Sequence, residues 1–391
     1  MLIDLDAPPA RRPPPPVDRR WFGAVAAAVL LLMLGGAAGV PEPGKVRQVA
    51  SSGGAVVASL LTESALYTAQ AVTGENAVVE IWARSLTEGG ESWSARAPNG
   101  EVTLRSIGGT LVVVSDAAIT VLDARDGRVR WSERSAFSAI VVGERVLLSY
   151  DDVEWGAKTT FTDLASGRKL WSVEGQPDVA FLDESGRYLV AADYGGHTVL
   201  RDTASGRILA TRELDVLDGM VMIIGDRVLV SRAARLLALR LPDLERLWEV
   251  TTPFPETMQP CGGLLCVTDS RGLAAFDPAT GDERWRTAVW TSYHQPAAVR
   301  ADGQGVAVGA DGRAVVLDPV TGRTVRELGR GRPVGDLMLR FADGQMWITG
   351  LRSGRVMGSV PGVIPFGCTT AGRFLGCPVA AGAFTVWETP R

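Results

Sequence analysis

Four cysteines and two histidines are the scarce reactive side chains of this chain of 391 residues. The cysteines form two close pairs, Cys261 with Cys266 and Cys368 with Cys377, without the C-x-x-C spacing of a metal or redox motif and without a histidine nearby. Four cysteines allow three pairings. Each close pair could bridge a short hairpin, where two side chains come within disulfide distance. We predict the structural disulfides Cys261–Cys266 and Cys368–Cys377; a catalytic or metal role is the alternative.

A second group of candidate residues, mostly aromatic and acidic, lies in two loops and one connection between predicted strands. Its members are Tyr150, Asp151, Asp152 and Trp155 in the first loop, Tyr194 and His197 in the second, and Trp290, Tyr293 and His294 in the connection. Aromatic and amphipathic side chains on rigidly held loops are typical of a surface that recognises a protein or a glycan. Solvated loops with incidental aromatic residues are the alternative. The residues that could instead bind Ca²⁺ are Asp151, Asp152, Glu154 and Asp193, although no fixed ligand spacing supports that site.

The composition argues against several other functions. Hydrophobic residues make up 46% of the chain, too many for a disordered protein, and the net charge is −4 with a pI near 5.5. Nucleic acid is therefore not expected as the main partner, because phosphate binding needs a concentrated basic surface. The sequence also lacks the hydrolase motifs G-x-S-x-G and H-E-x-x-H and the phosphate-binding Walker loop.

The first 40 residues predict a membrane anchor. Residues 22–40 are uncharged and apolar, and at 1.5 Å per residue they span roughly 28 Å, about the thickness of the hydrocarbon core. Residues 1–21 form a Pro/Arg-rich tail, which the positive-inside rule keeps in the cytoplasm. We therefore expect a single-pass protein of the cell membrane, with residues 41–391 extracytoplasmic. A cleaved signal peptide is the alternative, because small residues at 37–39 would suit a cleavage site.

The exported part of the chain repeats about every 40 residues. In the clearest copies an apolar strand is followed by Asp, three residues, Gly, three residues and Trp, as in the segments that end at Trp131, Trp171 and Trp285. Asp can accept backbone hydrogen bonds in a tight turn, and Gly supplies the positive φ that the turn needs. Each copy therefore predicts a β-hairpin whose Trp lies on one face of the second strand. Two more alternating strands precede each hairpin, which makes four strands per repeat, as in one blade of a propeller.

This hairpin pattern, notably FDPATGDERW (276–285) and LDPVTGRTV (317–325), resembles the repeat of the quinoprotein-type (PQQ-like) β-propellers over nearly all of residues 44–391. The resemblance implies an all-β propeller. Quinoprotein dehydrogenases hold pyrroloquinoline quinone and Ca²⁺ on the propeller axis, often beneath a Cys-Cys disulfide. This sequence has neither Cys-Cys nor a matching set of calcium ligands. The resemblance therefore points to cofactor-free members, such as the propeller scaffold of the outer-membrane β-barrel assembly machine, which present loops to partner proteins.

The sequence predicts that the two ends of the exported part complete each other. Residues 44–49 resemble an outer strand, and residues 383–391 resemble a strand that stops before its own outer strand. We expect the ends to share the last blade, because a closed ring leaves no open edges. Seven hairpin copies and this shared blade predict eight blades, with seven as the alternative. Residues 333–363 are strand-like but show no clear hairpin repeat.

In a propeller, the two loops and the connection named above open on one face. We therefore predict that their residues form a partner-binding face. The chain is predicted to be a membrane-tethered, extracytoplasmic propeller that binds a protein partner at the bacterial cell envelope, without catalysis and without a cofactor. The alternative is a degenerate quinoprotein oxidoreductase, or a hydrolase, with its site in the axial funnel.

Overall fold

The computed structural model divides the chain into two compact units, Met1–Pro43 and Gly44–Arg391. The structure describes residues 46–72, 78–115, 118–152, 156–183, 185–193, 195–214, 219–300, 302–364 and 366–390. The predicted tail (1–21) and membrane span (22–40) lie outside these ranges. None of the helices within the ranges has the length and apolar character that a bilayer crossing needs.

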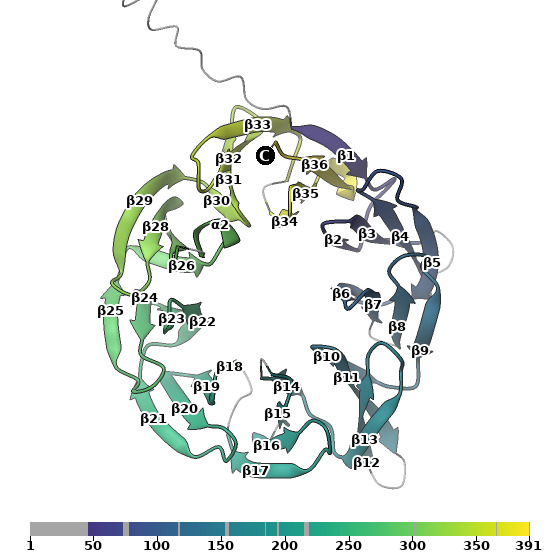
Figure 1. Ribbon diagram of the computed structural model, residues 1–391, viewed down its shortest axis with the longest axis vertical. Coiled ribbons are helices and arrows are strands. Elements are labelled where there is room, and N and C mark those ends of the chain that lie inside the picture. Colours follow the sequence, from purple (N-terminus) through teal and green to yellow (C-terminus); the bar gives the residue numbers. More distant parts are fainter. Residues whose placement is uncertain are drawn as a thin grey trace, which may run out of the picture. The chain divides into compact units, whose positions relative to one another are not determined.

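The second unit consists of nine antiparallel sheets of four strands each, arranged as a ring (Figure 1). In every sheet the first strand lies nearest the centre of the ring and the fourth lies at the periphery. Eight sheets use four consecutive strands, and only the closing sheet joins distant parts of the chain. The predicted all-β propeller is therefore confirmed.

The strands of the first five of these sheets are, in chain order, β2 (Ala58–Leu61), β3 (Ala65–Ala71), β4 (Val78–Ser85), β5 (Trp93–Pro98), β6 (Thr103–Ile107), β7 (Thr110–Ser115), β8 (Ala118–Asp123), β9 (Val129–Glu133), β10 (Ser138–Val142), β11 (Arg145–Asp152), β12 (Gly156–Asp163), β13 (Lys169–Glu174), β14 (Val179–Leu182), β15 (Tyr188–Ala192), β16 (His197–Asp202), β17 (Ile208–Glu213), β18 (Met220–Ile224), β19 (Arg227–Arg232), β20 (Arg235–Arg240) and β21 (Arg246–Thr251). The next three sheets contain β22 (Pro255–Cys261), β23 (Leu264–Asp269), β24 (Gly272–Phe276), β25 (Glu283–Thr287), β26 (Trp290–His294), β27 (Gly305–Gly309), β28 (Arg313–Asp318), β29 (Arg323–Arg330), β30 (Arg332–Val334), β31 (Leu337–Ala342), β32 (Gln345–Gly350) and β33 (Val356–Pro361). The closing sheet contains β34 (Thr369–Ala371), β35 (Phe374–Pro378), β36 (Phe384–Glu388) and β1 (Arg47–Ser51). A short helix, α2 (Ala297–Arg300), follows β26, and a 3₁₀ turn, η1 (Ala380–Gly382), precedes β36.

The predicted sharing of the last blade is confirmed. Strand β1 pairs with β36 as the outer strand of the closing sheet. Arg47 forms an ion pair of 2.6 Å with Glu388, and the backbone N–H of Ser52 donates to the carbonyl of Phe384 at 2.8 Å. The ring is thus closed by hydrogen bonds between its two ends.

The predicted number of eight blades is wrong, because residues 332–361 form a complete sheet of their own, β30–β33. Its hairpin has Gly350 where five of the other copies have Asp, and the N–H of Gly354 donates to the Gly350 carbonyl at 2.9 Å. Gly358 takes the position of the repeat Trp. This copy is also short, because β30 has only three residues. The hairpin geometry survives without the residues that marked it in the other copies, and the ring has nine blades.

Alternate residues of each middle strand fill the gaps on its two sides. In β7, Leu111 and Val113 pack with Ile81 of the preceding sheet, while Val112 packs with Val146 of the following sheet. Because successive side chains of a strand point to opposite faces, one buried strand can supply two inter-sheet cores. This explains why many second strands, such as β7 and β15, have apolar residues at consecutive positions, whereas apolar and polar residues alternate in peripheral fourth strands such as β5.

Five tryptophans on fourth strands fasten each sheet to the next one. In each case the indole Nε1–H donates to the carbonyl of the residue that follows the first turn residue of the next sheet. These bonds join Trp93 to Ala124 (3.2 Å), Trp131 to Leu164 (2.7 Å), Trp171 to Thr203 (2.8 Å), Trp248 to Pro278 (3.1 Å) and Trp285 to Pro319 (2.8 Å). The indole also covers the turn glycine: a Cβ on Gly167, whose φ is +70°, would lie 2.8 Å from the Trp131 ring. The paired Trp and Gly of the repeat therefore belong to one contact between neighbouring sheets.

Two sheets use different residue pairs for the same contact. Where Ala210 replaces the Trp, the next turn has Leu244 in place of Gly, at φ +55° and fully buried. Where Arg326 replaces the Trp, its Nη2 donates to the carbonyl of Leu351 at 2.7 Å, as an indole would. In the first case a larger turn residue, Leu244, compensates for the missing Trp. In the second case Arg326 donates the hydrogen bond in place of the indole.

The carboxylates of five turn aspartates, Asp123, Asp163, Asp202, Asp277 and Asp318, are hydrogen-bonded in the native state, and each has a lowered pKa. The pKa of Asp163 lies below its usual value chiefly because the Ser166 hydroxyl donates to Oδ1 at 2.6 Å; the Ser166 N–H and the Arg145 guanidinium act in the same direction. A native pKa below the unfolded one contributes stability above the unfolded pKa, near about 4, and this stability is lost as the pH falls through the native pKa.

The free energy of unfolding should therefore decline as the pH drops below about 4, and less steeply in a variant with Asp163, Asp202 and Asp318 all changed to Asn. Urea unfolding between about pH 6 and pH 2 measures both slopes. An equally steep decline in the variant would mean that other carboxylates govern acid stability.

Both predicted disulfides are present and both lie across the first two strands of their sheets. Cys261 and Cys266 join β22 to β23, with their Cα atoms 5.7 Å apart. Cys368, directly before β34, is bonded to Cys377 of β35, with a Cα distance of 4.1 Å. The second disulfide lies in the closing sheet, where it supplements the pairing of the chain ends.

Candidate functional site

Every sheet presents its strand ends on two opposite faces of the ring. Because the strands are antiparallel, the turns after the first and third strands lie on one face, which we call the hairpin face. The turns after the second strands, and the connections from each fourth strand to the next sheet, lie on the other face, which we call the connection face. The predicted binding residues were assigned to this connection face.

Part of the predicted group does lie on the connection face. Tyr150 and Asp151 are close to the end of β11, and His197 begins β16. Asp152 ends β11 and Trp290 begins β26, so both positions are also at this face. Trp155 and Tyr194, with Glu154 of the alternative calcium site, lie outside the described residues.

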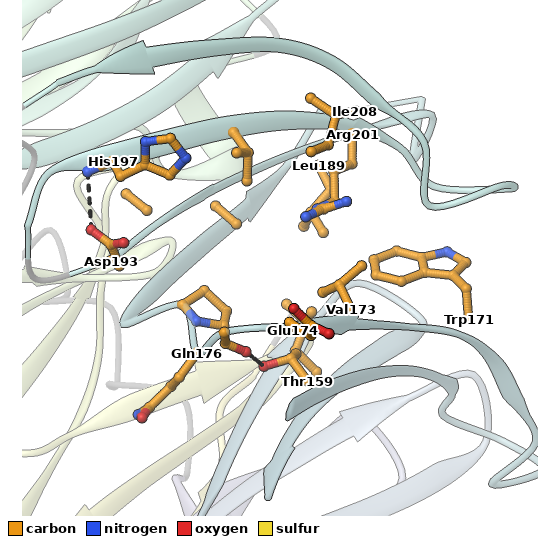
Figure 2. A pocket seen from close by; sticks show the side chains of 16 residues that line it. Thr159, Trp171, Val173, Glu174, Gln176, Leu189, Asp193, His197, Arg201 and Ile208 are labelled. Carbon is orange, nitrogen blue, oxygen red and sulfur yellow. Dashed lines mark hydrogen bonds between the residues drawn. The ribbon is translucent and has the colours of Figure 1, made fainter. Parts of the chain in front are cut away.

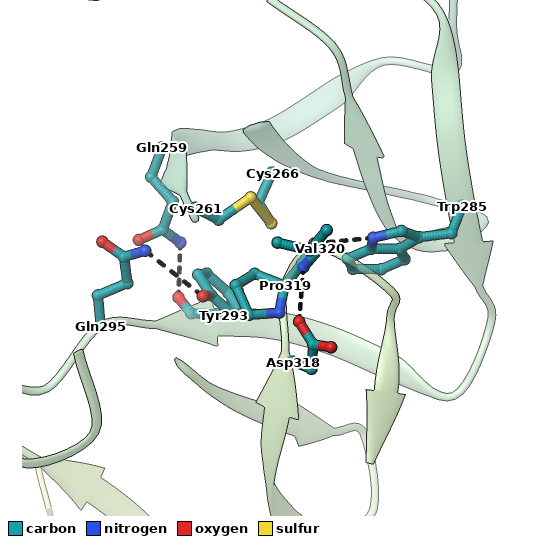
Figure 3. Close-up of a disulfide and its surroundings, with 9 residues drawn as sticks. All are labelled: Gln259, Cys261, Cys266, Trp285, Tyr293, Gln295, Asp318, Pro319 and Val320. Carbon is teal, nitrogen blue, oxygen red and sulfur yellow. Dashed lines mark hydrogen bonds between the residues drawn. A yellow bond between two sulfur atoms is a disulfide. The ribbon is translucent and has the colours of Figure 1, made fainter. Parts of the chain in front are cut away.

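The remaining two residues of the group, Tyr293 and His294, belong to strand β26 and not to a loop. Tyr293 is only 2% exposed and packs with the Cys261–Cys266 disulfide (Figure 3), and its hydroxyl accepts a 3.4 Å hydrogen bond from Gln295. Its ring lies against Gly305, where a Cβ would collide with it. His294 is at the far end of β26, away from Trp290. It is exposed by its accessible area, yet the protein atoms around its ring desolvate the imidazolium and lower its pKa, and the nearby Arg332 acts in the same direction.

Tyr150 has mainly a packing role in the structure. Its ring is half-buried against the core between sheets β6–β9 and β10–β13, and its hydroxyl donates to Glu133 at 3.2 Å. Burial, together with the negative charge of Glu133 and this hydrogen bond, raises the pKa of Tyr150 to about 12. The phenol is therefore neutral at physiological pH and is held as a hydrogen-bond donor.

Large exposed hydrophobic side chains instead gather on the connection face, in five of the connections between sheets. Phe254 (59% exposed) and Phe366 (68%) are the most exposed aromatic residues among them. The members of this set, which we call the apolar connection residues, are Val57, Phe137, Phe254, Val289, Ile364 and Phe366. Among the described turns of the hairpin face, only Val320 is a comparable residue, and three fourth strands begin at this face with an exposed apolar residue, namely Val129, Ile208 and Val356. The apolar connection residues were not among the residues predicted from the sequence; the signal that marks them is an apolar residue just before a first strand.

A pocket of about 230 Å³ lies between sheets β10–β13 and β14–β17 (Figure 2). Its mouth is on the connection face, where the connection Glu174–Pro177 meets Asp193 and His197. The backbone N–H of His197 donates to Asp193 Oδ1 at 3.0 Å, and the imidazole Nδ1 lies 2.9 Å from Glu213 Oε1. From there the pocket extends to Trp171 of the peripheral strand β13 and to Arg201, which directly precedes the hairpin turn of its sheet. His197 is thus the predicted residue that the structure places beside a cavity.

No group of three His, Cys, Asp or Glu side chains that could hold a metal ion occurs among the described residues. The inter-sheet pocket is lined by polar and apolar residues alike, and its carboxylates, Glu174 and Asp193, are not part of such a group.

Comparison with known proteins gives the family. The family model described as outer membrane protein assembly factor BamB matches residues 79–221 and 199–343, more than half of the chain. The chain belongs to this family. This match confirms the resemblance to PQQ-like propellers that the repeat had indicated. No curated protein matches the sequence.

Several solved structures share the propeller architecture. The crystal structure of BamB from Moraxella catarrhalis is 16% identical, covering 88% of this chain and 100% of that chain, with a TM-score of 0.46. A eukaryotic initiation factor is 11% identical, covering 79% and 91% of the two chains, with a TM-score of 0.56. Sqt1 from Saccharomyces cerevisiae is 11% identical, covering 89% and 98%, with a TM-score of 0.52. The last two likenesses support the propeller fold alone.

Proposed function

We propose that this chain is a non-catalytic scaffold that binds a protein partner through the connection face of its propeller, while tethered to the extracytoplasmic side of the bacterial cell membrane. The observation that carries the proposal is the concentration of apolar connection residues on one face of the ring. Membership of a family described as an assembly factor supports a role in binding other proteins.

Exposure of the apolar connection residues to water has a cost in free energy. Exposed aromatic and aliphatic groups that gather on one face are typical of interaction sites, because a partner that covers them removes apolar surface from water. The ring holds the connections between hydrogen-bonded sheets, so little conformational entropy is lost when a partner binds. Phe254 and Phe366, the most exposed aromatic residues of the set, are the candidate anchor residues.

The proposed location has separate support. The uncharged apolar segment 22–40 is long enough to span a bilayer and follows an arginine-containing tail. Two disulfides and no free cysteine among the described residues fit an oxidising compartment outside the cytoplasm. We therefore assign the N-terminus to the cytoplasm and the propeller to the envelope side.

Site-specific photocrosslinking in intact cells tests this proposal. A photoreactive residue in place of Phe254 or Phe366 should crosslink to the same partner, whereas one in place of Val320, an exposed apolar residue of the hairpin face, should not. Phe254→Ser with Phe366→Ser should weaken binding of that partner at least about tenfold, because buried aromatic anchors commonly contribute more than 1.4 kcal/mol each. Equal crosslinking from position 320, or unchanged binding of the double variant, would contradict the proposed face. Protection of the propeller from protease added outside the cytoplasmic membrane would contradict its location.

A further inference from the structure

The inter-sheet pocket exists because strand β15 departs from the pattern of its neighbour β11. The pairs Arg145–Asp163 and Tyr188–Asp202 set the two sheets in the same register. In that register Leu148 corresponds to Ala191. Leu148 fills the preceding inter-sheet gap, whereas the smaller Ala191 leaves its own gap partly open. The next residue on the same side of the strand is also smaller, since Tyr150 of β11 corresponds to Asp193 at the end of β15. The loss of these two large side chains opens the pocket.

Arg201 directly precedes the first residue of its hairpin turn. Buried apolar residues occupy this position in several other sheets, among them Leu122, Leu239, Phe276 and Leu317, all at most 3% exposed. The polar residues at this position elsewhere are the buried Thr162 and Thr349 and the exposed Arg84. Arg201 differs from all of them, because its partly buried guanidinium lines a cavity, where it loses hydration. A partly desolvated charge at a cavity indicates a ligand of opposite charge.

The guanidinium of Arg201 is only partly satisfied within the protein. Its Nη1 donates to the carbonyl of Gly206 at 2.8 Å, and it forms no ion pair within the described part of the chain. Burial lowers the pKa of Arg201, which is the sign of an uncompensated charge. Arg286 is the contrasting case: burial opposes its charge, but hydrogen bonds to Glu283 and Asp269 raise its pKa. Four of the five N–H donors of Arg201 remain for a ligand.

The rest of the pocket limits the ligand to a small, singly charged molecule with an apolar part. Val199, Leu189 and the ring of Trp171 line it, and 230 Å³ equals the liquid volume of about eight water molecules. Glu174 and Asp193 also line the pocket and repel any anion, a dianion such as phosphate most strongly. The ligand is therefore restricted to one negative charge, and that charge must be compensated by pairing with Arg201, the one arginine among the described lining residues. A planar carboxylate matches the two parallel N–H donors of a guanidinium.

We propose that this pocket binds a carboxylate on a short apolar body, with the carboxylate paired to Arg201 and the apolar body against Val199 and Trp171. This inference goes beyond the proposed partner binding and does not depend on it. The carboxylate could belong to a free small acid or to the C-terminal residue of a peptide, and the two sources are distinguished below.

Titration with hexanoate, which has about eight non-hydrogen atoms, tests the pocket. Binding is followed in the whole protein by the indole N–H resonance of Trp171, assigned with Trp171→Phe. Hexanoate should shift this resonance saturably, and hexanamide should bind at least about tenfold more weakly, since a charge-assisted hydrogen bond is worth about 1.5–3 kcal/mol. The peptide Gly-Gly-Leu and its C-terminal amide form the second arm.

Three variants separate a binding site from a structural effect. Arg201→Leu should bind hexanoate at least tenfold more weakly while melting at an equal or higher temperature, because leucine is native at this position in other sheets. Ala191→Leu, which copies Leu148, should fill the pocket and abolish binding of hexanoate and hexanamide alike. Arg207→Leu removes an exposed arginine of the same sheet and should change neither.

Saturable binding of hexanoate alone identifies a free small acid as the ligand, and binding of Gly-Gly-Leu alone identifies a chain terminus; either result supports the proposal. Absence of binding by both probes, equal binding of acid and amide, or unchanged hexanoate binding in Arg201→Leu would overturn it. None of these outcomes bears on crosslinking at Phe254, so failure here is distinguishable from failure of the scaffold role.

Discussion

Replacing Trp131 by alanine should lower the free energy of unfolding by about 2–3 kcal/mol. The substitution removes a half-buried indole from the core between sheets β6–β9 and β10–β13, and it leaves the Leu164 carbonyl without its 2.7 Å hydrogen bond. Truncation of a fully buried Trp usually costs about 3–5 kcal/mol, and the partial exposure of Trp131 places it below that range. Equilibrium unfolding in urea measures the change.

A double-mutant cycle with Gly167 shows whether the indole and the turn glycine act as one contact. Gly167→Leu alone should be at least as harmful as Trp131→Ala, because the new side chain meets the indole and must adopt a φ near +70°. In Trp131→Ala with Gly167→Leu, the leucine can occupy the space that the indole left. We expect the double variant to be about 1–2 kcal/mol more stable than the sum of the single changes predicts.

The protein already contains the natural precedent for this exchange. Ala210 and Leu244 are the corresponding pair between sheets β14–β17 and β18–β21, and Leu244 is fully buried at φ +55°. The control is Trp131→Phe, which keeps most of the apolar area and removes the hydrogen bond, and should cost about 1 kcal/mol. Strict additivity in the cycle would show that the two positions are independent.

Removal of strand β1 should destabilise the propeller more than loss of any one tryptophan contact. A protein that begins at residue 53 instead of residue 44 leaves β36 as an unpaired edge and exposes the core around Phe384 and Val386, against which Val49 and Ala50 pack. The loss of several inter-strand hydrogen bonds and of this apolar burial should exceed about 3 kcal/mol. Thermal unfolding of the two proteins gives the comparison.

The truncated protein should also associate through its open edge, because exposed strand edges pair with other chains. A synthetic peptide of residues 44–52 should restore the melting temperature and the monomeric state, since it can add as the outer strand of the closing sheet. A peptide with Ala50→Pro, which disrupts the pairing opposite Val386, is the matched control. A truncated protein as stable as the longer one would show that β1 does not close the ring.

The repeat pattern was sufficient to predict most of the fold. Asp163 and Gly167 are required by the geometry of one hairpin, and Trp171 by a contact with the turn of the next sheet. Because hairpin and contact are repeated together, the three residues recur at a fixed spacing. The disulfide pairs were predictable for the same reason, since hairpin strands bring their cysteines together locally. Local requirements of this kind leave a residue type at a fixed spacing.

The ninth sheet escaped prediction because its local requirements are met by different residues. Glycine at 350 and 354 satisfies the turn without a side-chain acceptor, and Arg326 supplies the inter-sheet hydrogen bond that an indole supplies elsewhere. The same hydrogen bonds form and the turn glycine is kept as Gly354, but the Asp and the Trp that marked the clearest copies are absent. A motif defined by residue types detects a copy of the repeat only if that copy makes the contact with the same residue types.

The sequence was less able to predict which of the candidate binding residues are exposed. Tyr293 was expected on the surface because it is aromatic and lies between two repeats, yet it is buried beside the Cys261–Cys266 disulfide and covers Gly305. Phe254 lies in a corresponding connection and is 59% exposed. Whether an aromatic residue there points into the core depends on where its strand begins, and a shift of one residue reverses the side that it faces.

The four cysteines and two histidines illustrate the division between sequence and structure. The pairing of the cysteines followed from the sequence alone, because each pair is separated by a single turn and the hairpin brings its members together. The places of His197 beside a pocket and of His294 at the opposite end of a strand were decided by tertiary structure. The pocket itself depends on Ala191, Asp193 and Arg201 of one sheet facing Trp171 of another. Such a site depends on how two sheets pack against each other, and the spacing of residues along one strand does not determine that packing.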